Sequence, residues 1–265
     1  LDARERFCGH GVPTRRLAMS ASATAPRFEI QGREVTFPVV VRRATSGAAT
    51  FLVSAAAARR LVPVPGIEVA EVLPGRALCS IAAIDYRDND LGDYNEVSVA
   101  FFVRPRGEAR GIPYLGAALD LARNRLGTYI RHLPVDQSFT CEAGCAIWGF
   151  PKTVQRIDFE YGAQRATCTL FQGGQHALTL SLARGGGRAL PDARMTTYTS
   201  IQGIPHRTAF TSGAEGFGIR LGGAELTLGS GPIADELRSL GLPKRALMTA
   251  WMESMHGHFE PAEKL

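Results

Sequence analysis

Lysine is the residue type whose distribution in this chain points to chemistry. The sequence holds three lysines, Lys152, Lys244 and Lys264, although lysine and arginine together number 30. Lys244 follows a helix-stop signal and Lys264 is next to last, so both fit solvated surface charge. Lys152 differs because it ends the mostly apolar run Ala-Ile-Trp-Gly-Phe-Pro-Lys.

An amine in apolar surroundings loses the hydration that favours its charged form, so its pKa falls. The neutral amine is a nucleophile that can attack a ketone, lose water and become an iminium ion, which withdraws electrons from the neighbouring carbon. The alternative is a surface lysine after a turn proline. The residues alone leave both interpretations of Lys152 open.

Other candidate ligands and motifs are weaker. His256 and His258 would need a third metal ligand from elsewhere, and Cys141 and Cys145 fit no standard zinc spacing. The sequence also lacks a Gly-Lys-Ser/Thr phosphate loop, a dinucleotide glycine fingerprint and a Gly-x-Ser-x-Gly elbow. We therefore predict no metal and no organic cofactor.

Strands are the elements that must position Lys152. The chain contains 29 glycines and 15 prolines, which indicate many turns. Between the turns lie apolar or alternating runs of strand length. The predicted strands cover residues 35–41, 78–86, 96–103, 155–161, 166–171 and 176–182.

Helical signals are few. They predict short helices at residues 54–61, 115–126 and 232–240, the last with a first-turn proline and a Gly-x-Pro stop. Residues 246–259 are ambiguous between helix and strand. We expect residues 1–26 to be a disordered extension, with Met19 as an alternative start to Leu1 and a basic transit peptide as an alternative interpretation, and residues 27–265 to form one domain.

Composition narrows the classes of partner. Hydrophobic residues make up 45% of the chain, and the net charge of +5 comes from scattered arginines rather than basic runs, which disfavours nucleic-acid binding. The five cysteines form no CxxC pair or disulfide framework, so we expect a reducing cytoplasm. No apolar run is long enough to span a bilayer, and no membrane association is expected.

The segment around Lys152 resembles the active-site segment of the acetoacetate decarboxylase family. The likeness rests on Gly149-Phe150-Pro151-Lys152, with Gly144 eight residues before the lysine. Residues 32–35 resemble the family's early strand with an arginine, and residues 91–96 resemble the segment that carries its pocket glutamate. The likeness continues in consistent order from about residue 28 to 260.

The resemblance implies a fold and a set of site residues. The fold is α+β and mainly antiparallel, a curved sheet forming a cone-like or partly closed β-barrel with a few short helices. Lys152 would form the imine, Glu96 would be a pocket acid, and Arg33 would bind the substrate carboxylate. Phe150 and Trp148 would line the substrate site. From the residues alone, Arg33 could equally lie at a strand edge in water, and Glu96 could be exposed on an alternating strand.

The implied activity is a cofactor-independent carbon–carbon lyase that decarboxylates acetoacetate or a related β-keto acid, in a homo-oligomer. Acetoacetate decarboxylase is the established example of a lysine activated in this way. The sequence departs from the family pattern because Thr153 replaces a second lysine and Cys145-Ala146 replaces an Arg-Glu pair. An imine-forming aldolase, dehydratase or hydratase acting on a keto acid, and a non-catalytic small-ligand-binding protein, therefore stay open as alternatives.

Overall fold

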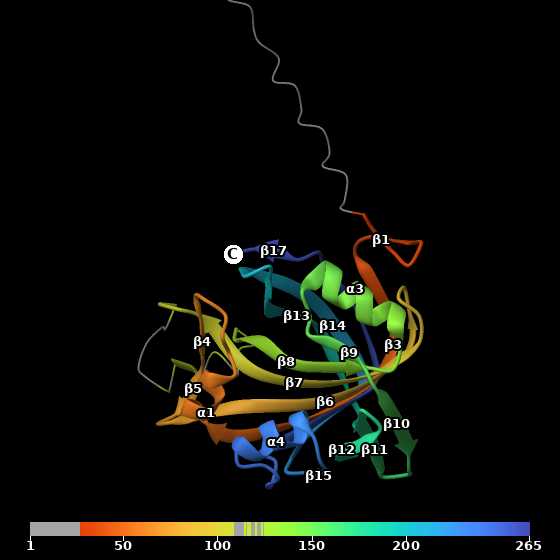
Figure 1. Ribbon diagram of the computed structural model, residues 1–265. Coiled ribbons are helices and arrows are strands. Elements are labelled where there is room, and N and C mark those ends of the chain that lie inside the picture. The colour runs from red at the N-terminus through yellow and green to blue at the C-terminus, as the bar shows by residue number, and fades with distance from the viewer. Residues whose placement is uncertain (1–26, 109–113, 115, 118–119, 121–122, 124) are drawn as a thin grey trace, which may run out of the picture.

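The computed structural model describes residues 27–108, 114, 116–117, 120, 123 and 125–265. The extension predicted at residues 1–26 and half of the residues of the helix predicted at 115–126 lie outside these ranges. Within them, strands dominate and the helices are short (Figure 1). The predicted α+β class with mainly antiparallel strands is confirmed.

Seven strands of the described chain form a closed barrel. The pairing of the first and last strands in this ring closes it, and one pair in the ring, β13 with β8, is parallel. The sheet is thus more completely closed than the cone or partly closed barrel that we expected. In ring order the strands are β7 (Tyr94–Pro105), β6 (Arg76–Asn89), β3 (Val39–Ser54), β16 (Met248–Phe259), β14 (Ile204–Leu221), β13 (Arg188–Ile201) and β8 (Gly127–Val135).

Further strands extend or cover the barrel. Four of them add to strands of the ring: β4 (Ile67–Val69), β5 (Glu71–Leu73), β9 (Lys152–Val154) and β17 (Glu263–Lys264). A separate hairpin is made of β1 (Phe28–Ile30) and β2 (Arg33–Val35). A second sheet contains β10 (Arg156–Tyr161), β11 (Arg165–Gln172), β12 (Gln175–Ala183) and β15 (Ala224–Leu228).

Two of the helices follow the sequence signals. Helix α1 (Ala55–Arg60) begins after Ser54, whose hydroxyl accepts a hydrogen bond from the Ala57 amide, and α4 (Pro232–Ser239) begins with its first-turn proline. Helix α3 (Ser138–Trp148) was not predicted. No helix in the described part of the chain has the length and apolar character needed to cross a bilayer.

Five of the six predicted strands are confirmed within one to three residues of their ends. The exception is residues 35–41, which are divided between β2 and β3. The ambiguous segment at 246–259 is mainly the strand β16. Strands β13 and β14 and the long continuation of β3 were not predicted, although they form much of the barrel.

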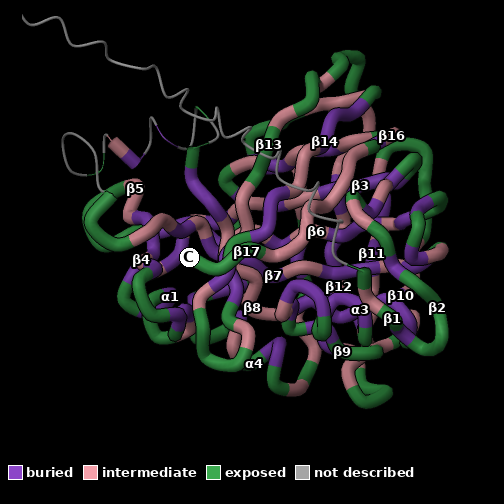
Figure 2. Tube along the Cα trace, turned by 90° about the horizontal axis from the view of Figure 1, so that it is seen from above, coloured by how far each residue is buried: buried purple, intermediate pink, exposed green. Residues whose placement is uncertain are grey.

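The barrel wall separates two hydrophobic clusters. Along β7, Tyr94 and Glu96 face α3, whereas Val97, Val99 and Phe101 belong to the cluster shared with the second sheet and α4. This alternation follows from the two-residue period of a strand. Buried residues therefore occur on both faces of the barrel wall, and the exposed residues concentrate at the connecting turns (Figure 2).

A β-bulge in β8 fixes α4 to the outer wall. His132 pairs with Val99 and Ile130 pairs with Ala100, so Arg131 is the additional residue. Such a bulge lets neighbouring side chains point the same way. Arg131 and His132 both contact the Glu236 carboxylate of α4, at 2.8 Å each.

This contact shifts the titration of Glu236. Burial disfavours the charged carboxylate, but hydrogen bonds from His132 and Arg131 outweigh that cost and lower the pKa of Glu236 to about 2, from 4.5. Stability from a carboxyl group with a lowered pKa is present above the unfolded-state value and is lost as the pH falls through the folded-state value.

We predict that Glu236→Gln lowers the free energy of unfolding by about 2 kcal/mol at pH 6 after allowance for solvent screening. The difference from wild type should shrink as the pH falls from 4.5 towards 2. Urea unfolding across this pH range measures it, with exposed Glu160→Gln as the control. A constant difference over the whole range would contradict this account of Glu236.

Candidate active site

Lys152 enters the barrel region from a tight connection. Helix α3 ends at Gly149, whose φ of 65° lies in the left-handed region that favours glycine. Phe150 and Pro151 then lead to β9, where Lys152 pairs in parallel with Leu133 of β8. The Lys152 side chain is only 4% exposed, so the alternative of a surface lysine is wrong.

The buried amine contacts a buried carboxylate. Lys152 Nζ lies 2.9 Å from Glu96 Oε2, and the Glu96 side chain is 8% exposed. Lys152 Nζ also donates a hydrogen bond of 3.1 Å to Thr140 Oγ1 on α3. The structure thus brings together two residues, Lys152 and Glu96, that are 56 positions apart in the sequence.

Gly144 explains the spacing of the Gly-to-Lys motif. A Cβ atom on Gly144 would lie 2.5 Å from Lys152 Cδ and 2.7 Å from Lys152 Cε. Any larger residue on this face of α3 would therefore occupy the space of the lysine side chain. A helix glycine normally weakens a helix relative to alanine, so here it serves the close approach of Lys152.

Two stacked tyrosines form another wall of the site. The Tyr94 ring centroid lies 4.8 Å from Lys152 Nζ, and the Tyr94 and Tyr86 rings stack with centroids 4.4 Å apart. Burial raises the pKa of both phenols, and the neighbouring Glu96 raises that of Tyr86 further. Both tyrosines therefore remain neutral at physiological pH.

The resting site is an ammonium–carboxylate pair. Burial alone disfavours the charged form of Lys152, as the sequence predicted, but the adjacent Glu96 and then Tyr94 outweigh it and raise the pKa of Lys152. The expectation of a lowered pKa from an apolar environment is wrong in direction, because the sequence did not show that a carboxylate would contact the amine.

Arg33 lies outside this cluster. It is exposed on β2, and its guanidinium stacks over the Phe139 ring of α3, 4.1 Å from the ring centroid. Phe139 is next to Thr140 in the helix, so Arg33 reaches the site's supporting helix. Its role as a carboxylate ligand stays a prediction.

Trp148 and Phe150 are buried and stack on each other with centroids 5.7 Å apart. The Trp148 indole donates to the Glu260 carbonyl, and the Thr199 hydroxyl donates to the Trp148 carbonyl. These contacts fasten the end of α3 to β13 and the C-terminal segment. The predicted role of both aromatics in substrate binding remains a prediction.

The positions that depart from the family pattern are near the lysine but point elsewhere. Thr153 is exposed, on the opposite face of β9 from Lys152. Cys145 is also exposed, and its thiol donates to the Lys152 carbonyl at 3.6 Å. Among the described residues, no group of three histidine, cysteine or acidic side chains is placed to hold a metal.

Sequence reasoning missed Tyr94, Tyr86 and Thr140. Tyr94 had a detectable signal, because it lies two positions before Glu96 and so shares its face of the strand. Tyr86 pairs with Tyr94 across β6 and β7, and that register is not visible in the sequence. Thr140 required recognition of α3 as a helix.

A family comparison covers most of the chain. The sequence model described as acetoacetate decarboxylase (ADC) matches residues 25–263. No curated protein sequence matches the chain.

Solved structures share the fold at low identity. An acetoacetate decarboxylase from Legionella pneumophila subsp. pneumophila strain Philadelphia 1 superposes with a TM-score of 0.61 and 15% identity, covering 95% of this chain and 92% of its own. Another acetoacetate decarboxylase structure superposes with a TM-score of 0.59 and 16% identity, covering 87% of this chain and 90% of its own. The enduracididine biosynthesis enzyme MppR superposes with a TM-score of 0.56 and 16% identity, covering 92% of this chain and 98% of its own. That structure is complexed with the condensation product of pyruvate and imidazole 4-carboxaldehyde.

We predict that Gly144→Ala destabilises the protein by about 1–2 kcal/mol, because overpacking against Lys152 exceeds the gain in helix propensity. Denaturant unfolding provides the measurement. Gly187→Ala is the matched control, since its Cβ would meet nothing within 4 Å. Equal or greater stability of Gly144→Ala would show that Lys152 does not need this space.

Proposed function

The chain belongs to the acetoacetate decarboxylase family, and we propose on that premise that it is a cofactor-independent enzyme whose Lys152 forms an imine with a small keto acid. The observation that carries this proposal is the buried contact of 2.9 Å between the Lys152 amine and the Glu96 carboxylate. A buried pair of titratable groups with perturbed titration is a frequent mark of an active site.

The pair can generate the nucleophile within the site. When a keto acid displaces water, the proton of the Lys152 ammonium passes to Glu96, which leaves a neutral amine and a neutral carboxylic acid. The amine adds to the ketone carbon, and an amine proton moves to the former carbonyl oxygen. Glu96 then returns its proton to this hydroxyl group, water leaves, and the iminium ion forms beside the Glu96 carboxylate.

The surroundings favour the cationic intermediate. The Tyr94 ring lies 4.8 Å from the lysine nitrogen, where its π face can stabilise an iminium charge. Thr140 already accepts a hydrogen bond from the same nitrogen and holds it in place.

The leading reaction is decarboxylation of acetoacetate or a related β-keto acid. The electrons of the bond to the carboxylate flow to the iminium nitrogen, carbon dioxide leaves, and an enamine remains. The enamine carbon takes up one proton, and water hydrolyses the resulting iminium to release the ketone and Lys152. Arg33 is proposed to draw in the substrate carboxylate from its position over Phe139.

A second reaction is supported by Glu96 and Thr153. The Glu96 carboxylate next to an iminium can remove a proton from the adjacent carbon, which generates an enamine for aldol, dehydration or hydration chemistry. Thr153 supplies no second ammonium group. MppR has been solved with pyruvate bound, which makes a 2-keto acid a reasonable substrate class to test here. A keto-acid-binding protein without catalysis is the remaining alternative.

We predict that Lys152→Ala and Lys152→Arg both lose turnover, because arginine stays protonated. Intact-protein mass spectrometry after incubation with acetoacetate and borohydride tests the imine, with Lys152→Ala and acetone alone as controls. A lysine-dependent adduct without the carboxyl group, in excess of the acetone control, supports decarboxylation. An adduct that retains the carboxylate supports the second reaction, and no adduct with acetoacetate or pyruvate would refute the imine.

Glu96→Gln should remove the largest contribution that opposes the effect of burial, so the pKa of the Lys152 amine should fall. In a plot of kcat/KM against pH, activity should rise as the amine loses its proton. The midpoint of this rise should therefore move to lower pH in Glu96→Gln. The maximum itself should fall about 100-fold or more, because the acid–base group is gone. Glu142→Gln, exposed on α3, is the matched control, and an unchanged profile for Glu96→Gln would exclude the proposed proton transfer.

A further inference from the structure

The inner face of the barrel wall differs from its outer face. The second sheet, α1 and α4 all pack against one face, and a ring of seven strands has no room for them inside, so this face is the outer one (Figure 1). Its residues on β7 include Val97 and Val99. Because side chains alternate along a strand, Glu96, Ser98 and Ala100 point into the barrel.

The strand registers align the inward-pointing residues in rings around the barrel axis. Glu96 pairs with Ile84 of β6, and Ile84 pairs with Ser46 of β3. Two residues farther along each strand lies a set that we name the alanine ring, made of Ser98, Ala82, Ala48 and Ala250. After two further residues follows the upper ring, made of Ala100, Ser80, Thr50 and Met248. From Glu96 to the upper ring the strand rises roughly 13 Å.

Small side chains leave the centre of the barrel open. Three members of the alanine ring end in a single methyl group, whereas larger side chains are needed to fill a small barrel. Solvent reaches this layer, because Ala48 and Thr50 are partly exposed in the middle of β3. Their neighbours on the outer face, Ala49 and Phe51, are 0% exposed. The exposure of Ala48 and Thr50 must therefore come from an open channel inside the barrel.

The channel is closed at the Lys152 end and open at the other. Glu96 is only 6% exposed at the end that α3 covers. Leu221, which pairs with Met248 of the upper ring, is 83% exposed. Leu221 also borders a hollow of about 370 Å³ at the open rim, together with Leu52 of β3. The reactive amine thus lies at the bottom of a path that begins at this rim.

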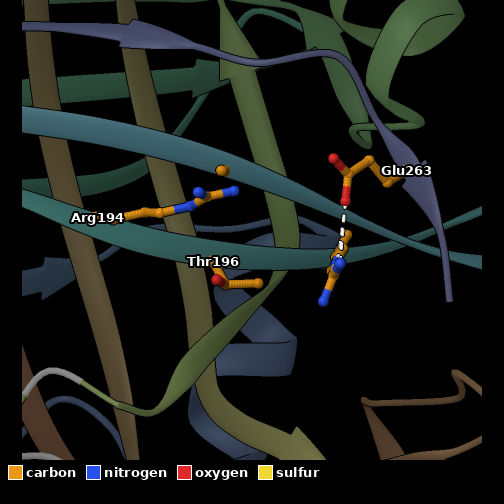
Figure 3. A pocket seen from close by; sticks show the side chains of 5 residues that line it. Arg194, Thr196 and Glu263 are labelled. Carbon is orange, nitrogen blue, oxygen red and sulfur yellow. Dashed lines mark hydrogen bonds and ion pairs between the residues drawn. The ribbon is translucent and has the colours of Figure 1, made fainter.

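The two rings above Glu96 are uncharged. Neither the alanine ring nor the upper ring contains an ionisable side chain. On β13 and β14, charged side chains lie on the outer face, where Arg207 pairs in register with Tyr198 of the outer cluster and binds Glu263. Figure 3 shows the polar hollow that Arg194 and Glu263 line there. An uncharged lining of methyl and hydroxyl groups suits an apolar chain and disfavours a second carboxylate or a phosphate.

We propose that the channel receives the non-reacting part of the substrate, so that the keto acid carries an unbranched apolar chain of several carbon atoms. This inference rests on the proposed imine, because the bond to Lys152 holds the keto carbon at the closed end. The chain then extends past the alanine ring towards the rim. Acetoacetate has only one methyl group on that side of its keto carbon and would leave both rings in contact with water.

Saturated carboxylates of increasing length test the channel without imine chemistry, because they carry no ketone. Isothermal titration from butyrate to octanoate should give an affinity that rises about fourfold per methylene group buried between the rings. Ala48→Leu and Ala82→Leu each place a larger side chain in the channel. Each should weaken octanoate binding about 10-fold, because two or more methylene groups lose their place. Ala56→Leu, exposed on α1, is the matched control and should bind octanoate as wild type does.

Borohydride capture followed by intact-protein mass spectrometry gives the second measurement. From an equimolar mixture of acetoacetate and 3-oxooctanoate, wild type should capture mainly the longer ketone, and Ala82→Leu should lose this preference. Thermal unfolding verifies that each variant is folded, and the wild-type series decides the matter if one is not.

An affinity of wild type that does not change with chain length would overturn the channel. The same length dependence in wild type and in both folded variants would overturn it as well. Equal capture of the two keto acids would overturn the assigned substrate class and leave the imine intact. Length-dependent binding of carboxylates without any borohydride adduct would instead refute the imine while supporting the channel.

Discussion

The need to neutralise one buried ammonium group organises the structure around Lys152. An unpaired lysine in this buried environment would lose its charge. Lys152 remains ionised because the Glu96 carboxylate lies 2.9 Å from its amine. That contact requires β7 and β9 to be held in fixed relation on either side of β8. The same pair that stabilises the resting amine holds the proton that the proposed imine chemistry would have to move.

Chain connectivity explains why helix α3 lies against the lysine. Strands β8 and β9 are parallel neighbours, and a parallel pair needs a crossover rather than a tight hairpin. Helix α3 is this crossover, and it supplies Thr140 as the acceptor for Nζ and Gly144 as the space for the lysine stem. The eight-residue interval from Gly144 to Lys152 is thus the distance from the helix face, around the Gly149 turn, to the first residue of β9.

The sequence was sufficient for the fold class, for strands β6, β7, β10, β11 and β12, and for Lys152 and Glu96 as candidates, because these follow from alternation, composition and family resemblance. Helix α3 was missed since threonine, cysteine and glycine have low helix propensity and only tertiary packing makes the segment helical. The long continuation of β3 was missed as well, and within it Gly47 allows Trp251 and Leu182 to pack against the strand. The sequence could not predict the raised pKa of Lys152, because this shift depends on a contact with Glu96, which is distant in the sequence.

Glu96 determines the protonation state of Lys152 through the contact of 2.9 Å, and this dependence can be measured directly. The chain has only three lysines, so NMR of protein labelled with ¹³C at lysine Cε gives few signals, and Lys152→Ala assigns the buried one. A pH titration should show Lys152 deprotonating above the ordinary range of a lysine amine in wild type, and at a clearly lower pH in Glu96→Gln. If the titration of Lys152 is the same in both proteins, Glu96 does not control the charge of this amine.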